Sequence, residues 1–188
     1  MVVGSIKNSL IYSLGATLLD VILGVAIAWV IVRSKIWGRS VIDALMMLPL
    51  AVPGLVIAFG YGALSDPHGH FRGIMDLGGG GPMFLLILAY AVRRLPYVVR
   101  AAVAGLQQSD PVLEEAAQSM GASPRRTFKR IALPLIGASV TAGAILAFAF
   151  AMLEVSDSLI LAQQVEHYPV TKAIYALLST LRNGHEIA

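Results

Sequence analysis

The chain has 188 residues, of which 57% are hydrophobic and only 13% are charged, and its mean hydropathy is +0.75. Because soluble domains carry about 25% charged residues, this composition excludes an ordinary soluble domain and places the chain among membrane proteins. The lack of cysteine excludes disulfides and thiolate metal sites. For a membrane protein, the formal net charge of +3 says less than the positions of its basic residues.

Four apolar blocks are each close to the roughly 20 residues that a helix needs to cross a membrane. They cover residues 8–32, 41–64, 83 to at least 92, and 133–153. In the third block, Arg93 and Arg94 follow the apolar core. We expect both side chains to reach towards the interface while the helix continues through Pro96.

Proline and glycine interrupt the second block at Pro49, Pro53, Gly54 and Gly60. Inside a membrane helix, proline removes a backbone hydrogen bond and kinks the axis. Broken membrane helices of this kind line substrate pathways in transporters, and in other proteins a kink serves packing alone. Pro53 is therefore a candidate residue of a substrate pathway, with a packing kink as the alternative.

Most lysines and arginines lie in two segments that share one side of the membrane, between the first and second blocks and between the third and fourth. They are Arg33, Lys35, Arg39, Arg93, Arg94, Arg100, Arg125, Arg126, Lys129 and Arg130. The segment over residues 65–82 contains only Arg72. By the positive-inside rule, the segment between the third and fourth blocks is cytoplasmic, and both chain ends face outside.

This cytoplasmic segment has the residues of two short helices. Ser109 or Asp110 is a natural N-cap, and Pro111 suits the first helical position. Gly121 predicts a left-handed C-cap that stops the first helix. Ser123-Pro124 repeats the combination of cap and proline, and starts a second helix that carries four basic residues.

The spacing within the segment is specific: Glu115-Ala116-Ala117, three residues, Gly121, nine residues, Ile131, one residue, then Leu133-Pro134. It resembles the cytoplasmic coupling motif of ABC importer permeases, the loop that seats an ATPase subunit. The segments at 48–54 and 94–97 look like those of permeases grouped with iron(III), polyamine, thiamine or phosphonate importers.

The resemblance implies an all-α membrane protein with the type I ABC importer core and about four membrane helices. A single permease domain over residues 1–188 would contain a cytoplasmic coupling loop at 93–132 and an outer amphipathic segment at 165–188. Because the family core has five helices, the chain is expected to be truncated before a final helix. The implied ATPase-coupling residues are Glu115, Ala116, Ala117, Gly121, Ile131, Leu133 and Pro134.

The resemblance also implies the partners. Gly78 to Gly81 is followed by Pro82 and not by the lysine of a nucleotide-binding loop. No cofactor is therefore expected in this chain, and ATP and magnesium would be bound by separate ABC ATPase subunits. The other partners would be a second permease subunit or fused half, a solute-binding protein outside the cell inner membrane, and the lipid bilayer. No nucleic acid is expected, because a helix-turn-helix domain needs a third packed helix.

Three carboxylates are candidates for the substrate pathway. Asp20 lies mid-span, where a carboxylate marks either a functional site or a packing residue bonded to a hydroxyl such as Ser13 or Thr17. Glu154 and Asp157 are three residues apart, so a continuing helix would place both on one face near the outer end. A cationic solute would suit them and favours iron(III), while a hydrated interfacial face is the alternative.

Two functions of other classes are alternatives. An ion-coupled secondary transporter would use Asp20, and a membrane-embedded metal-dependent enzyme would use the pair His68 and His70 beside Asp66. No nucleophile elbow or metalloprotease spacing is present in the sequence, so we do not expect an enzyme.

Overall fold

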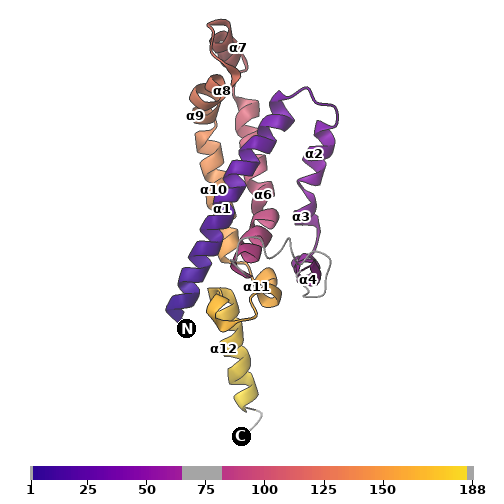
Figure 1. The fold of residues 1–188 in the computed structure, drawn as a ribbon, viewed down its shortest axis with the longest axis vertical. Helices are drawn as coiled ribbons and strands as arrows, with labels where there is room; N and C mark the ends of the chain where they lie inside the picture. Colours follow the sequence, from indigo (N-terminus) through magenta and orange to yellow (C-terminus); the bar gives the residue numbers. More distant parts are fainter. Residues whose placement is uncertain (1, 65–81, 186–188) are drawn as a thin grey trace. The chain divides into compact units, whose positions relative to one another are not determined.

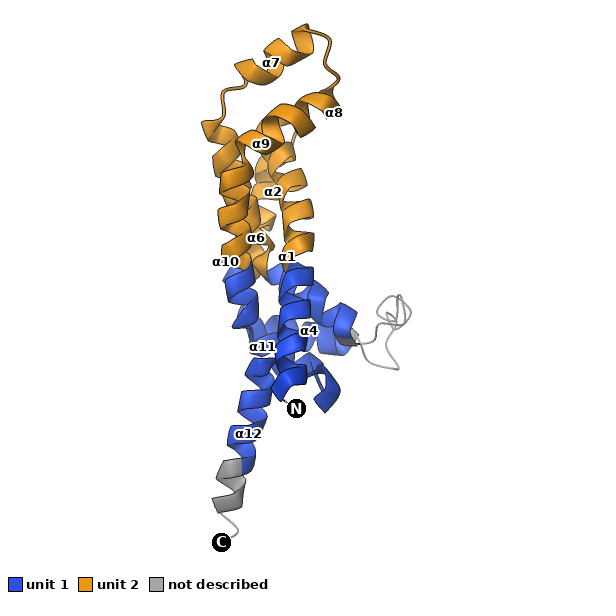
Figure 2. Ribbon diagram, turned by 90° about the vertical axis from the view of Figure 1, so that its left-hand side faces the viewer, with its two compact units in different colours: residues 1–16, 50–93, 148–188 blue, residues 17–49, 94–147 orange. Residues whose placement is uncertain are grey.

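The computed structural model describes residues 2–64 and 82–185, and this part of the chain is built from helices with no β-strand (Figure 1). It divides into two compact units (Figure 2). Unit 1 comprises Met1–Ala16, Leu50–Arg93 and Phe148–Ala188, and unit 2 comprises Thr17–Pro49 and Arg94–Ala147. The helical architecture agrees with the all-α expectation.

The first predicted span corresponds to α1 (Val2–Arg33), a helix of 32 residues. It is long and apolar enough to cross a membrane alone. Two bent pairs qualify as well if each is counted as one span, namely Arg39–Ala51 with Gly54–Ala63, and Pro124–Leu135 with Gly137–Met152. By length and composition, the described residues thus hold one to three candidate spans. The helix that contains the predicted third block, Pro82–Gln108, carries three arginines and is not among these candidates.

The second predicted span is broken into three short helices: α2 (Arg39–Leu45), α3 (Leu48–Ala51) and α4 (Gly54–Leu64). The break before α4 falls at Pro53, whose carbonyl accepts hydrogen bonds from the amides of Val56 and Ile57 at 3.0 and 3.3 Å. The predicted interruption by proline is therefore confirmed at Pro53, where the ring removes the donor that a continuous helix needs.

The third predicted span is α6 (Pro82–Gln108), which runs unbroken through Pro96 as expected. The remaining elements follow in chain order: α7 (Val112–Ser119), α8 (Pro124–Thr127), the π-helix η1 (Phe128–Ala132), α9 (Leu133–Leu135), α10 (Gly137–Met152), α11 (Ser156–Leu161), the 3₁₀-helix η2 (Val165–His167) and α12 (Val170–His185).

Unit 2 is held together by an apolar core from α1, α6 and the start of α10. Its buried members are Val25, Ala28, Val99, Ala102, Val103, Leu106, Ile136 and Val140. Small residues let α6 and α10 approach closely, since a Cβ added at Gly143 would lie 2.6 Å from that of Ala101. These helices form the base from which α7 and α8 project (Figure 2).

In unit 1, polar side chains near the start of α1 fix the segment before α12. The Asn8 side-chain amide donates to the Glu166 carbonyl at 2.7 Å, and the Tyr12 hydroxyl donates to the His167 carbonyl at 3.2 Å. In the same unit, α11 packs against α4. The last helix of the broken second span, α4, and the chain after α10 therefore meet within one compact unit.

Candidate functional site

The two predicted short helices are present as α7 and α8, and local side chains decide where α7 begins. The Asp110 carboxylate accepts a hydrogen bond from the Val112 amide at 2.9 Å. Ser109, the other candidate cap, instead donates its hydroxyl to the Leu106 carbonyl at 2.9 Å. Of the two candidate caps, Asp110 is the one whose side chain bonds an amide at the start of α7, while Pro111 directly precedes the helix.

The end of α7 confirms the predicted left-handed glycine. Gly121 has φ +89°, a conformation that favours glycine because other residues place Cβ too close to the carbonyl oxygen. Its amide donates to the Gln118 carbonyl at 2.9 Å, and the Ala122 amide donates to the Ala117 carbonyl at 3.0 Å. These two bonds form a Schellman motif, which ends α7 sharply and fixes the direction of the chain towards α8.

The second helix is shorter than the sequence indicated. Ser123 has the expected extended backbone before Pro124, although its hydroxyl makes no capping hydrogen bond. After α8 the chain winds into the π-helix η1, which the sequence analysis missed. The available signal was Pro134, which has no amide hydrogen for the Arg130 carbonyl and so disturbs the regular α-helical ladder just before the span.

The motif residues divide between exposed and half-buried positions. Glu115, Ala116 and Gly121 are exposed, and Ala117 is half-buried. Of the residues towards the membrane span, Ile131 is half-buried, whereas Leu133 and Pro134 are exposed. Glu115 and Ala116 therefore lie on the outer surface of α7, where a partner protein can reach them.

Apolar side chains beside the motif are exposed as well, which the spacing did not indicate. Met120 is 88% exposed, Val112 60% and Leu113 50%, all on or next to α7. We call the exposed side chains of α7, together with that of Met120, the α7 surface.

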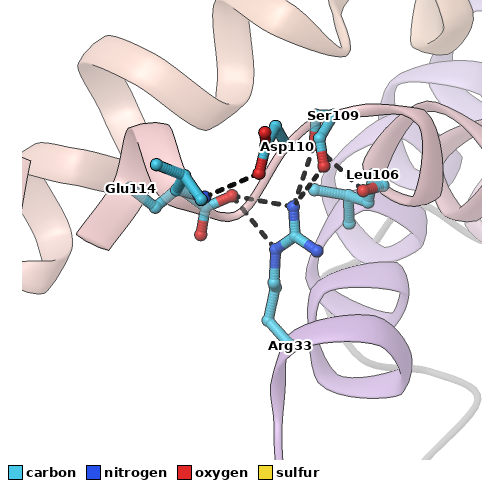
Figure 3. A network of polar contacts seen from close by, with 6 residues as sticks. Arg33, Leu106, Ser109, Asp110 and Glu114 are labelled. Atoms are coloured by element: carbon cyan, nitrogen blue, oxygen red, sulfur yellow. Dashed lines mark hydrogen bonds and ion pairs between the residues drawn. The ribbon is translucent and has the colours of Figure 1, made fainter. Parts of the chain in front are cut away.

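The side of α7 that faces the unit 2 base is anchored by Arg33, the last residue of α1 (Figure 3). Its guanidinium lies 3.0 Å from the Glu114 carboxylate and donates to the Ser109 hydroxyl at 2.9 Å and the Ser109 carbonyl at 3.2 Å. The side chains of Arg33 and Glu114 are only 14% and 8% exposed. The carboxylate next to the motif, and not Glu115 of the motif, therefore attaches α7 to the first helix.

A second contact to α1 lies one helical turn earlier. Trp29 and Phe128 of η1 pack edge to face, with ring centroids 4.9 Å apart and planes at 80°. Trp29 and Arg33 are four residues apart and therefore on the same face of α1. The face of α1 that carries Trp29 and Arg33 thus contacts both α7, which precedes the turn at Gly121, and η1, which follows it.

A further ion pair in unit 2 joins α2 to α6. Arg100 lies 3.0 Å from the Asp43 carboxylate, and the two side chains are 49% and 31% exposed. Exposed pairs of this kind contribute little to stability, about 0–1 kcal/mol. The pair is useful chiefly as a comparison for the buried contact at Arg33.

Asp20, the first of the candidate pathway residues, is almost fully buried at 1% exposure. Within the described part of the chain, neither its carboxylate nor the hydroxyls of Ser13 and Thr17 makes a hydrogen bond. The predicted carboxylate–hydroxyl contact is therefore not formed. Arg94 of α6 is the cation that acts electrostatically on Asp20.

Glu154 is buried and lies in a break between α10 and α11, so the continuing helix assumed from the sequence is not present. Its carboxylate lies 3.3 Å from the Arg93 guanidinium and accepts a hydrogen bond from the Ser156 amide at 3.1 Å. Arg93 also packs against Gly54 at the Pro53 break, where an added Cβ would overlap the guanidinium.

Asp157 is fully buried in α11, and neither carboxylate forms the hydrated face that was the alternative interpretation. A buried Glu154 beside an arginine also weakens the argument for a pair of cation-binding carboxylates. The candidate metal ligands His68 and His70 lie outside the described residues. Within the described residues, no group of three or more His, Cys, Asp or Glu side chains is placed to hold a metal ion.

The described residues thus form broken helical spans and two short helices, α7 and α8, of which α7 is held to α1 by Arg33. Residues 20–183 match the family model of the binding-protein-dependent transport system inner membrane component, and the chain belongs to this family. This is the permease family of ABC importers, an inner-membrane family with the type I fold, as the resemblance implied.

Similar proteins agree with this assignment. The chain is 31% identical over 151 residues to the sulfate transport system permease protein CysT of Salmonella typhimurium, covering 78% of the chain and 54% of the relative. It is 30% identical over 186 residues to the molybdenum transport system permease protein ModB of Haemophilus influenzae, covering 96% and 81%. Identity to the ferric transport system permease protein FbpB of Actinobacillus pleuropneumoniae is 34% over 153 residues, covering 81% and 21%.

The chain spans about half the length of the sulfate permease relatives. All three relatives described are transport permeases and not enzymes. This family membership argues against the metal-dependent enzyme and against the secondary transporter that the sequence left as alternatives.

Proposed function

We propose that this chain is a permease subunit of an ATP-driven importer and that the α7 surface docks into a separate ATPase subunit. The observation that supports this most is that one short helix, α7, carries exposed side chains and also a buried carboxylate that is bound to α1. Glu115 and Met120 are exposed, while Glu114 is held by Arg33. A partner that displaces α7 would therefore act on α1 through a short and largely buried contact.

The remaining partners follow from this role. The ATPase subunits would bind ATP and magnesium, since this chain is proposed to have no cofactor of its own. A second permease subunit or fused half would complete the pathway, and a solute-binding protein would deliver the solute from outside. Asp20, Pro53, Glu154 and Asp157 are proposed to lie along that pathway, with Arg93 as a charged neighbour of Glu154.

We propose a small inorganic ion as the solute, because the relatives are named for sulfate, molybdenum and ferric transport. Iron(III), favoured from the sequence by Glu154 and Asp157, is one candidate, and a tetrahedral oxyanion is the other. The ion pair of Glu154 with Arg93 reduces the negative charge available to iron(III). Calorimetric titration of the accompanying binding protein with ferric citrate, sulfate and molybdate would distinguish the candidates.

Gly121→Val should weaken binding of the ATPase subunit about ten-fold. A β-branched residue in the left-handed conformation costs about 1–2 kcal/mol, and 1.4 kcal/mol corresponds to a factor of ten in affinity. The Schellman turn would relax and misdirect the α7 surface. Fluorescence titration of a labelled ATPase subunit with the purified permease measures the change.

Gly38→Val is the matched control for that experiment. Gly38 is also left-handed, at φ +94°, and no atom lies within 4 Å of an added Cβ at either glycine. Equal backbone strain at Gly38 should leave ATPase affinity unchanged. Glu115→Lys, at an exposed position, should weaken the affinity without strain. Normal ATPase binding by both the Gly121 and Glu115 variants would refute docking through α7.

A further inference from the structure

A basic cluster lies between the α7 surface and the membrane span, and the proposed ATPase contact does not account for it. Ser123 and four cations line an open hollow of about 320 Å³ within unit 2. The cations are Arg125, Arg126, Lys129 and Arg130. This volume is at the small end of the range for ligand sites in proteins. All four cationic side chains are exposed.

The charge of this cluster is not balanced within unit 2. Arg125 and Lys129 are four residues apart, as are Arg126 and Arg130, and like charges at this spacing destabilise a helix. Among the described residues, no carboxylate forms an ion pair with any of the four. On the adjoining α7, Glu114 is already paired with Arg33. An external anion would relieve the repulsion.

Apolar side chains directly after the cluster indicate which anion fits. Leu133 is 38% exposed and Leu135 is 49% exposed, and both precede the apolar helix α10. A free phosphate, or an acidic protein surface, would satisfy the cations but not these leucines. A phospholipid has a phosphate followed by acyl chains. The protein likewise has the cations first and the two leucines next, where it enters the membrane span. Clusters of four or more Lys/Arg next to a membrane span are typical of anionic lipid binding.

We propose that the basic cluster binds the headgroup of an anionic phospholipid of the cytoplasmic leaflet, with its acyl chain against Leu133 and Leu135. The lipid would neutralise η1 at the point where the chain enters the membrane. It would thereby stiffen the connection between α8 and α10 without touching the exposed α7 surface. The site is thus separate from the proposed ATPase contact.

The test uses the whole importer in nanodiscs of equimolar phosphatidylcholine and phosphatidylglycerol, with spin-labelled analogues of each lipid as probes. Electron paramagnetic resonance should show a preference for phosphatidylglycerol in the native protein. Lys129→Gln with Arg130→Gln should reduce that preference about 25-fold, because each of the two cations contributes about a five-fold change in affinity near an anionic surface. The exposed positions should allow normal folding.

Lys35→Gln with Arg39→Gln is the matched control, since it removes two exposed cations from another part of unit 2. It should change the preference less than about two-fold. An equal loss in both double variants would overturn the site, as would native protein without any preference. Competition by inorganic phosphate at equal effectiveness would assign a free-anion site instead.

Co-purification of the ATPase subunit is measured on the same samples. If the Lys129 and Arg130 variant loses the ATPase but keeps its lipid preference, the cluster is a protein contact and the lipid proposal is wrong. If the native chain retains no ATPase but does select phosphatidylglycerol, the lipid site stands and the proposed function fails. The two failures are therefore distinguishable.

Discussion

Replacing Glu114 with glutamine is expected to loosen α7 from α1 by about 3 kcal/mol, because removing one partner of a buried ion pair leaves the other charge uncompensated. Arg33 is only 14% exposed and has Glu114 as its carboxylate partner in the described structure. The chain has no cysteine, so a spin label on Ser119→Cys can report the mobility of α7 without background. We expect a more mobile label and loss of transport-coupled ATP hydrolysis.

Asp43→Asn is the control for this prediction. The Asp43–Arg100 pair has the same 3.0 Å separation as Arg33–Glu114 but is far more exposed. Its loss should cost about 0–1 kcal/mol and leave the label unchanged. The exchange of Arg33→Glu with Glu114→Arg should recover part of the loss. If Glu114→Gln and Asp43→Asn mobilise the label equally, the anchoring role of Glu114 is refuted.

Glu154→Gln is expected to lower the free energy of unfolding by about 3 kcal/mol for the same physical reason. Glu154 is 4% and Arg93 18% exposed at the side chain, and the variant removes the carboxylate that lies beside the guanidinium in the break between α10 and α11. Thermal unfolding of the purified permease, followed by circular dichroism, measures the loss. Arg93→Met with Glu154→Met should be less damaging than either single change, because neither charge of the pair is left buried without the other.

Glu166→Gln provides the matched control, since Glu166 lies in the same unit and is exposed. It should not change the midpoint of unfolding. A Glu154→Gln protein that unfolds normally but fails to transport would show that Glu154 acts on the solute and not on the fold. That outcome would restore the argument for iron(III) that the buried ion pair weakens.

Trp29 and Arg33 give the proposed coupling a physical route. They lie one turn apart on α1 and contact η1 and α7, on the two sides of the turn at Gly121. Displacement of either side would be resisted by the same face of α1. The exposed motif residue Glu115 and the buried Glu114 therefore have different surroundings although they are neighbours in the chain.

The sequence predicted the features that depend on a few consecutive residues. Gly121 requires no distant partner to adopt its left-handed turn, and Asp110 caps α7 through an amide two residues away. Pro53 interrupts its helix because its ring removes a donor, wherever the helix packs. The motif spacing from Glu115 to Pro134 likewise identified the family, which the match over residues 20–183 confirms.

Only the tertiary structure decided which charges meet. Arg33 and Glu114 are 81 residues apart, and no short pattern in the sequence pairs them. Glu154 was assigned to a continuing helix with a hydrated or cation-binding face, but the chain breaks there and Arg93 reaches it. Caps and turns are set by the backbone within one helical turn, whereas ion-pair partners are set by which helices pack together. That packing depends on the whole apolar core, so no short segment of the sequence determines it.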